Sequence, residues 1–356
     1  MKTAFSFAER AAGLSLRLIA AINLLFVAAF LATLLFAATK AGAQEAVACT
    51  GKDMLAQMQR EDPAALERIR AEAANVENGG ALLWKIEKEG VEPSYLFGTM
   101  HMADPRVVKL SEAAKAAFDA SSTVVIETTE VLDPAKAMAA MLANPEMTMF
   151  TDGTTLFSLL PEDERAEVEA ALNARGIPPA SVQKMKPWII ASMIALPACE
   201  LARKSAGAPV LDVELAKQAE ASGKALGGLE TIADQLGAMA SLPMDFHIRG
   251  LVDTLKLGDR VDDMIETMIV LYLGGDTAMF WPFFRVALQS DEETEAGFAA
   301  FEETMVTARN RTMAEHAAPF IDAGGAFVAV GALHLPGKEG LVALLRDAGY
   351  SIQAVN

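Results

Sequence analysis

Two stretches of the form Gly-x-x-His could place histidines where they bind a metal. The first is Gly98-Thr99-Met100-His101, and the second, Gly331-Ala332-Leu333-His334, begins 233 residues later. Each follows an apolar run that is typical of a strand. The carboxyl ends of parallel strands meet at one edge of a sheet, where open α/β sheets bind ligands. We therefore expect His101 and His334 to converge if their strands are close in the sheet.

Glu127 is the third residue predicted for this cluster. It follows Val124-Val125-Ile126, a short apolar run that is typical of a strand buried on both faces. Two imidazoles and a carboxylate are a common ligand set for a divalent metal that keeps one position open for water. Such a metal polarises a carbonyl and activates water. The residues predict a metal-dependent hydrolase that uses manganese, cobalt or zinc, with Glu127 as third ligand or general base.

A structural interpretation of the same residues stays open. A Gly-x-x-His tetrapeptide is common by chance, and a histidine at a strand end is often only hydrogen-bonded. His247 and His316 lie in helical stretches and are interpreted as structural. The sequence contains no HExxH, G-x-S-x-G or GxxxxGK[ST] motif, so the usual zinc-peptidase helix, the hydrolase elbow and the P-loop are excluded.

Two units of similar order must position these residues. In the first, a strand at 95–97 leads through a helix at 111–120 to the strand that ends at Glu127. In the second, a strand at 327–330 leads through a helix at 340–348 to a strand at 351–355. Each reads as a βαβ unit, and such crossovers make parallel pairs. Residues 81–98 are predicted to form a hairpin.

The chain between the two units is mostly helical, and Gly227-Gly228 is interpreted as a joint between two of its helices. The sequence therefore predicts an α/β fold. Its central sheet is mixed and mostly parallel, is built from the two Gly-x-x-His units, and carries a large helical insertion over about 134–316.

The first 43 residues have the three parts of a secretory signal. A basic start with Lys2, Arg10 and Arg17 precedes an uncharged apolar run over 18–39, and Ala41-Gly42-Ala43 follows. The run is long enough to span a bilayer, so 1–43 is either a signal peptide or an N-terminal membrane anchor. Both interpretations place the domain at 44–356 outside the cytoplasm, either periplasmic or secreted, or anchored to the inner membrane.

Charge and cysteine content limit the partners. The formal net charge is −17, and the leader is itself basic, so the rest of the chain is more acidic still. Such a chain repels nucleic acid and anionic lipid, and neither is an expected partner. An exported location permits a disulfide between Cys49 and Cys199, the two cysteines; the alternative is two buried thiols.

Several stretches resemble the TraB/GumN family, which is related to the Tiki metalloproteases and, more remotely, to erythromycin-esterase-like and ChaN-like proteins. The resemblance spans roughly residues 79–356. The stretches are YLFGTMHMADPR (95–106), VVIETTE (124–130), KPW (186–188), LDVELAKQAEASGKALGGLETIADQL (211–236), ARN (308–310) and VAVGALHLPGKEGLVALLRDAGYSIQAV (328–355).

The resemblance implies a peptidase site. In Tiki-like members the two Gly-x-x-His histidines and a glutamate are regarded as the metal-dependent centre, which here are His101, His334 and Glu127. The family's Arg-Asn pair would be Arg309 and Asn310, expected to steady an oxyanion formed from a peptide or small acyl substrate.

Two alternatives to the metallohydrolase stay open. Bacterial GumN-like members are often labelled exopolysaccharide biosynthesis proteins, which implies a non-catalytic accessory or ligand-binding protein in exopolysaccharide biosynthesis or export. The other alternative is a metal-free esterase that uses a histidine as base.

Overall fold

The computed structural model describes residues 48–288 and 292–355. The predicted leader, 1–43, lies outside these residues. In the described part of the chain, no helix combines the length and the apolar character that a membrane span needs.

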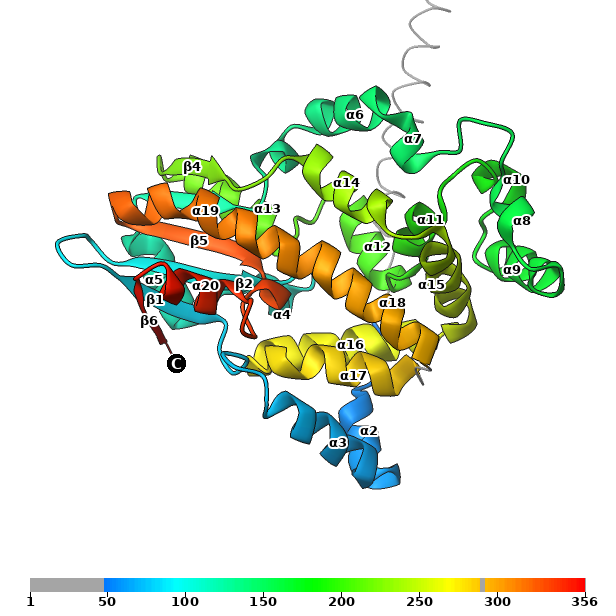
Figure 1. Cartoon of the computed structure of the whole chain (residues 1–356), viewed down its shortest axis with the longest axis horizontal. Coiled ribbons are helices and arrows are strands. Elements are labelled where there is room, and N and C mark those ends of the chain that lie inside the picture. Colours follow the sequence, from blue (N-terminus) through cyan, green and yellow to red (C-terminus); the bar gives the residue numbers. More distant parts are fainter. Residues whose placement is uncertain (1–47, 289–291, 356) are drawn as a thin grey trace, which may run out of the picture. The chain divides into compact units, whose positions relative to one another are not determined.

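A six-stranded sheet in the order β4-β3-β5-β2-β1-β6 forms the centre of the fold (Figure 1). The four strands β4, β3, β5 and β2 are parallel to one another, whereas β1 is antiparallel to both β2 and β6. This arrangement confirms the predicted mixed, mostly parallel sheet and the hairpin. The strands are β1 (Leu83–Glu87), β2 (Ser94–Thr99), β3 (Thr123–Ile126), β4 (Ala225–Gly228), β5 (Ala326–Gly331) and β6 (Ser351–Ala354).

The strands that carry the two Gly-x-x-His stretches are direct neighbours. β2 pairs with β5 in parallel, with Thr99 opposite Gly331, and β5 pairs on its other side with β3, with Ile126 opposite Ala329. The crossover from β2 through α5 (Glu112–Ala120) to β3 therefore passes over β5. As a result, the loops that leave β2, β3 and β5 start at the same edge of the sheet.

Burial on both faces explains why these strands form. Val124 and Phe327 belong to one apolar core, with α5, α13 (Leu211–Ala221) and α16 (Arg260–Gly274). Their chain neighbours Val125 and Val328 belong to a second core, with α19 (Ala308–Ala323) and α20 (Leu341–Asp347). Each such side chain contributes about 1.5–3 kcal/mol when it is fully buried. The sheet thus lies between two layers of helices.

β4 was not expected as a strand. Gly227-Gly228 is predicted from the sequence to be a joint between helices, whereas Ala225–Gly228 pairs in parallel with β3 at the edge of the sheet. Glycine has low strand propensity, so the local sequence does not indicate this strand. The pairing brings α19 onto it, since a Cβ at Gly227 would meet the Phe320 ring at 2.6 Å.

Most of the remaining helices belong to the insertion between the two βαβ units, and α2 and α3 precede the first strand. A third apolar core, which includes Leu172, Ile190 and Leu251, holds the outer part of the insertion together. The other elements are α2 (Met54–Glu61), α3 (Pro63–Ala73), α4 (Pro105–Val108), η1 (Thr129–Leu132), α6 (Pro134–Ala143), α7 (Pro145–Thr148), α8 (Leu156–Leu159), α9 (Glu162–Ala174), α10 (Pro179–Val182), α11 (Pro187–Ile194), α12 (Ala198–Ser205), α14 (Ile232–Ser241), α15 (Met244–Leu257), η2 (Thr277–Met279), α17 (Phe280–Leu288), α18 (Glu292–Glu302), the π-helical turn η3 (Glu303–Thr307) and η4 (Ala332–His334).

A disulfide joins Cys49, ahead of α2, to Cys199 in the first turn of α12, with their Cα atoms 5.2 Å apart.

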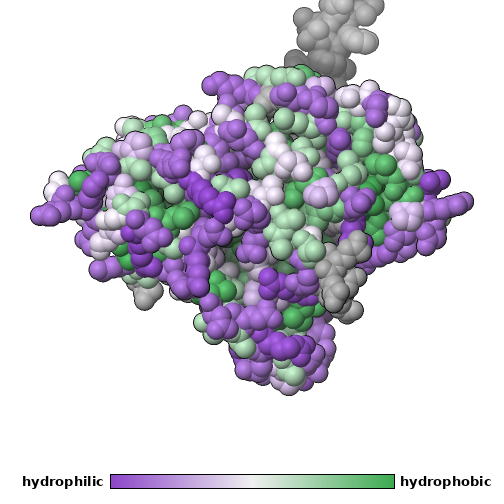
Figure 2. Space-filling view, viewed as in Figure 1, coloured by the Kyte–Doolittle hydropathy of each residue, from purple (hydrophilic) through white to green (hydrophobic). Residues whose placement is uncertain are grey.

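Figure 2 shows hydrophilic residues over much of the visible face, interrupted by hydrophobic patches. The sequence is acidic, with a net charge of −17, so many of its surface side chains are carboxylates.

Candidate metal and catalytic site

The two Gly-x-x-His histidines differ in their surroundings. His334 lies in η4, directly after β5, and is 5 % exposed. His101 lies in the loop after β2, and its side chain is 59 % exposed. One imidazole is therefore buried while the other faces solvent.

His334 is held in one tautomer by Asn310. Asn310 Nδ2 donates to the Glu339 carbonyl at 2.8 Å, so the Asn310 Oδ1 atom is the acceptor for His334 Nδ1 at 2.6 Å. Burial lowers the pKa of His334 to about 4. The ring is therefore neutral at pH 7, with its proton on Nδ1, and Nε2 presents a lone pair.

Glu127, directly after β3, is buried and fully hydrogen-bonded. Its Oε1 accepts from the Gly331 N–H at 2.7 Å, and its Oε2 accepts from Gln235 Nε2 at 2.9 Å and Arg309 Nη2 at 2.8 Å. Burial by itself raises the pKa of this carboxyl, but its neighbours, chiefly His334, His101 and Arg309, outweigh that effect and lower the pKa to about 2. Glu127 is therefore ionised at neutral pH.

The lone pair of His334 faces this carboxylate. His334 Nε2 lies 3.8 Å from Glu127 Oε1, too far for a hydrogen bond. Two atoms that share one tetrahedral divalent ion, each about 2.1 Å from it, are about 3.4 Å apart. Two electron-pair donors at this separation suit a cation between them.

Asp212, on α13, forms a second pair with His101. Its Oδ1 accepts from Thr99 Oγ1 at 2.6 Å, and its Oδ2 lies 3.4 Å from His101 Nε2. Among the residues described, the buried Oδ2 atom has no hydrogen-bond partner. The negative charge of the Asp212 carboxylate raises the pKa of His101 to about 9. A buried carboxylate oxygen that has an imidazole beside it and accepts no hydrogen bond is the kind of atom that a metal ligand provides.

Sequence reasoning missed Asp212. One signal was available, because Asp212 lies beside Leu211 and precedes Leu215, Ala216 and Ala219, which form the apolar face of α13. An acid next to such a face is buried and therefore needs a partner. The partner, Thr99, belongs to the first Gly-x-x-His stretch, which only the fold brings to α13.

The side chains gathered here are of the chemical types that bind divalent cations. They are two imidazole nitrogens and two carboxylates, arranged as the pairs His334–Glu127 and His101–Asp212. The electrostatic effect of His101 reaches both Glu127 and His334. Over residues 48–288 and 292–355, however, no three His, Cys, Asp or Glu side chains are grouped closely enough to hold an ion. The metal-ligand roles of His101, His334 and Glu127 stay predictions.

Arg309 lies beside the cluster in a buried ion-pair network. Its Nε and Nη2 atoms donate to Glu230 at 3.0 and 2.8 Å, and Nη2 also donates to Glu127 at 2.8 Å. Nη1 donates to the Met305 carbonyl at 2.9 Å. Asn310, the next residue, fixes His334. Both residues of the predicted Arg-Asn pair thus contact the predicted metal ligands, and their oxyanion role stays a prediction.

The loop that carries His101 is held by α12. The Ala103 N–H donates to Oε1 of the fully buried Glu200 at 2.5 Å, and Arg203 Nη1 donates to Asp104 at 3.0 Å. Arg106 also donates to Asp104, which lowers the pKa of this carboxyl against the effect of its burial. These contacts fix the backbone directly after His101.

These observations define an α/β protein with histidines and carboxylates gathered at the carboxyl ends of its parallel strands. The sequence model that describes the TraB/PrgY/gumN family matches residues 82–354, and the chain belongs to this family.

Similar proteins include Metalloprotease TIKI2 of Danio rerio, which is 24 % identical over 77 % of this chain and 60 % of that protein. Metalloprotease TIKI1 of Danio rerio is 25 % identical over 77 % of this chain and 63 % of that protein. Metalloprotease TIKI1 of Homo sapiens is 24 % identical over 77 % of this chain and 61 % of that protein. The chain thus spans about 60 % of the length of these relatives. No solved structure matches it.

Proposed function

We propose that this protein is a metal-dependent hydrolase that cleaves a peptide or small acyl bond. The observation that carries the proposal is the pairing of the neutral His334 Nε2 with the ionised Glu127 Oε1, 3.8 Å apart, where two parallel strands end. The similarity to proteins named metalloproteases supports the same class of reaction.

His101, His334 and Glu127 would hold the metal, and Asp212 would offer a further oxygen beside His101. A divalent ion such as manganese, cobalt or zinc supplies Lewis-acid polarisation of the acyl carbonyl and activation of water when it is bound. Because the pKa of Glu127 is about 2, this carboxylate is a weak base at neutral pH, so we assign it to metal binding rather than to proton abstraction.

Arg309 and Asn310 would position the metal ligands Glu127 and His334. The Arg309 guanidinium already donates through Nε, Nη1 and Nη2, and it fixes the orientation of Glu127. Asn310 keeps the proton of His334 on Nδ1, which leaves Nε2 free to bind a cation.

We propose that the protein works outside the cytoplasm, with residues 1–43 as its signal or membrane anchor. The Cys49–Cys199 disulfide supports an oxidising compartment.

The test is metal binding and hydrolysis by the purified protein. We expect it to take up one divalent ion, to cleave members of a fluorogenic peptide and acyl-ester panel, and to lose this activity with a chelator. The metal should also stabilise the fold, by about 2.7 kcal/mol at a free concentration 100 times Kd.

His101→Ala and His334→Ala should abolish both metal uptake and hydrolysis. His316→Ala is the matched control, because His316 bonds to the Leu229 carbonyl instead. Wild-type activity in both variants would rule out the proposal. Metal uptake without any hydrolysis would instead favour the accessory or ligand-binding role.

A further inference from the structure

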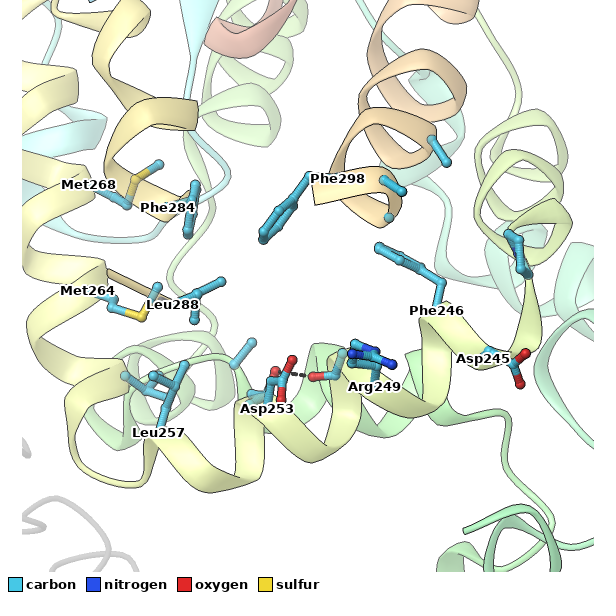
Figure 3. A pocket seen from close by; sticks show the side chains of 18 of the residues that line it. Asp245, Phe246, Arg249, Asp253, Leu257, Met264, Met268, Phe284, Leu288 and Phe298 are labelled. Carbon is cyan, nitrogen blue, oxygen red and sulfur yellow. Dashed lines mark hydrogen bonds between the residues drawn. The ribbon is translucent and has the colours of Figure 1, made fainter. Parts of the chain in front are cut away.

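A cavity of about 530 Å³ lies among α15, α16, α17 and α18, in the helical part of the molecule (Figure 3). Three phenyl rings and three aliphatic or thioether side chains dominate its wall. They are Phe246, Met264, Met268, Phe284, Leu288 and Phe298. In the part of the chain that the structure describes, His101, Glu127, Asp212 and His334 are not among its lining residues.

Water is a poor occupant of this cavity. At about 30 Å³ per molecule the volume would take about 18 waters, and each needs two to four polar partners. The wall offers few such groups, because apolar side chains make up most of it. Met264, Phe284 and Leu288 lie on one side of the cavity, and Phe246 and Phe298 project toward it from the other (Figure 3). Pockets of about 300–1,000 Å³ with such walls are typical of sites for small apolar ligands.

Gly250, within α15, keeps the cavity open. Its φ is not in the positive range, so no backbone conformation requires a glycine at this position. A glycine inside a helix costs about 1 kcal/mol relative to alanine. A Cβ at Gly250 would meet no atom within 4 Å, and the residue lines the cavity. A Cβ at this position therefore has open space around it, and a longer side chain here would compete with a ligand for the cavity.

The charged residues of the lining lie on one helix. Asp245, Arg249 and Asp253 follow one another at intervals of four residues along α15 (Figure 3). Two acids and one base make this edge acidic on balance, and Arg249 and Asp253 each have a partner within the protein. An anionic head group would be repelled here, whereas a hydroxyl can both donate and accept hydrogen bonds.

We propose that the cavity binds an uncharged single-chain amphiphile, such as a monoacylglycerol. The hydrocarbon chain lies among the phenyl and methionine side chains, and the hydroxylated head lies at the edge formed by Asp245, Arg249 and Asp253. This site is separate from the predicted metal site and does not depend on hydrolysis.

Displacement of the neutral fluorescent probe N-phenyl-1-naphthylamine tests the proposal, with protein recovered from cells that express the whole chain. We expect saturable displacement by monoacylglycerols, with affinity rising up to about fourfold per added methylene until the cavity is full. The fatty-acid anion of equal chain length should bind at least tenfold more weakly. No saturable displacement, or equal affinity for the anion, would overturn the proposal.

Substitutions of Gly250 locate the site. Gly250→Trp should fill the cavity and weaken binding at least tenfold, while Gly250→Ala should leave binding nearly unchanged. Neither should lower the melting temperature, because both replace a helical glycine. Gly250→Leu, of intermediate size, serves if the tryptophan variant does not fold. Wild-type affinity in the filled variants would contradict the assignment.

Discussion

Glu127 shows how single residues define the candidate site. Four groups bind or face its carboxylate, and they come from three parts of the chain. The Gly331 N–H and His334 belong to the second Gly-x-x-His stretch, Gln235 lies on α14 and Arg309 lies on α19. Gly331 permits this because a Cβ there would lie 3.2 Å from Glu127 Oε1. The neutral His334 therefore faces a carboxylate that stays charged, an arrangement that a bound cation would stabilise.

Asp212→Asn should weaken metal binding by about 10–100-fold, the usual cost of losing a group that supports a metal site. The physical reason is the loss of negative charge beside His101 Nε2, 3.4 Å away. Titration calorimetry with Mn²⁺ or Zn²⁺ would measure the effect. Thr99→Val, which removes only the hydrogen bond to Asp212, is the matched control and should cost less. Unchanged affinity in Asp212→Asn would exclude Asp212 from the site.

Arg309→Met should destabilise the fold by about 3–5 kcal/mol, because it leaves two buried carboxylates without their cation. Glu127 and Glu230 both bind the Arg309 guanidinium at 2.8 Å. Urea denaturation at pH 7 would measure the change. Adding Glu230→Gln should restore part of the stability, since it removes one of the two charges. A loss below 1 kcal/mol would show that the network is solvated.

At the scale of elements, two features set the positions of these side chains. η3 is a π-helical turn directly ahead of Arg309 and Asn310, and such turns often occur at functional sites because they shift the register of a helix. α12 carries Glu200 and Arg203, which hold the backbone of the His101 loop. A strand, a loop and helices of the insertion must therefore all be in place before the site exists.

α15 makes the stability of the insertion depend on pH. His247 on this helix is buried, burial lowers its pKa below 6.5, and its Nε2 has no partner among the described residues. As the pH falls below about 6.5, the unfolded chain takes up a proton that the folded chain resists, so stability decreases. His247→Leu should lose less stability than wild type between pH 7 and pH 5 in urea unfolding. Equal losses in the two proteins would contradict this role.

At the scale of the whole molecule, the strand order decides where the site lies. β5 comes from the C-terminal unit, yet it lies between β2 and β3 of the N-terminal unit (Figure 1). The two Gly-x-x-His stretches therefore meet only when the two ends of the domain are joined in one sheet. Metal binding and global folding should be coupled for this reason.

The Cys49–Cys199 disulfide closes a long covalent loop, with a sequence separation of 150 residues. In the chain-entropy model, a loop of that size is worth about 5 kcal/mol, whereas typical measured values are about 2–4 kcal/mol. The double variant Cys49→Ser with Cys199→Ser should therefore lower the free energy of unfolding by a few kcal/mol. Because Cys199 precedes Glu200, which binds the His101 loop, metal affinity should fall as well. A variant with unchanged stability and metal affinity would show that the bridge is dispensable.

The sequence by itself determined the elements whose signal is local. The apolar runs before Gly98 and Gly331 predicted β2 and β5, and Val124-Val125-Ile126 predicted β3, because strands buried on both faces need continuous apolar residues. The candidate residues at their ends followed from the same pattern.

Only the tertiary structure decided what depends on contacts between distant segments. It placed β5 between β2 and β3, brought Asp212 to His101, and made a strand of the glycine-containing β4. It also left open the cavity beside Gly250. The apolar face beside Asp212 is the one local signal among these features. The contacts themselves carry none, because hydrogen bonding between strands and packing between helices are set by partners far away in the chain.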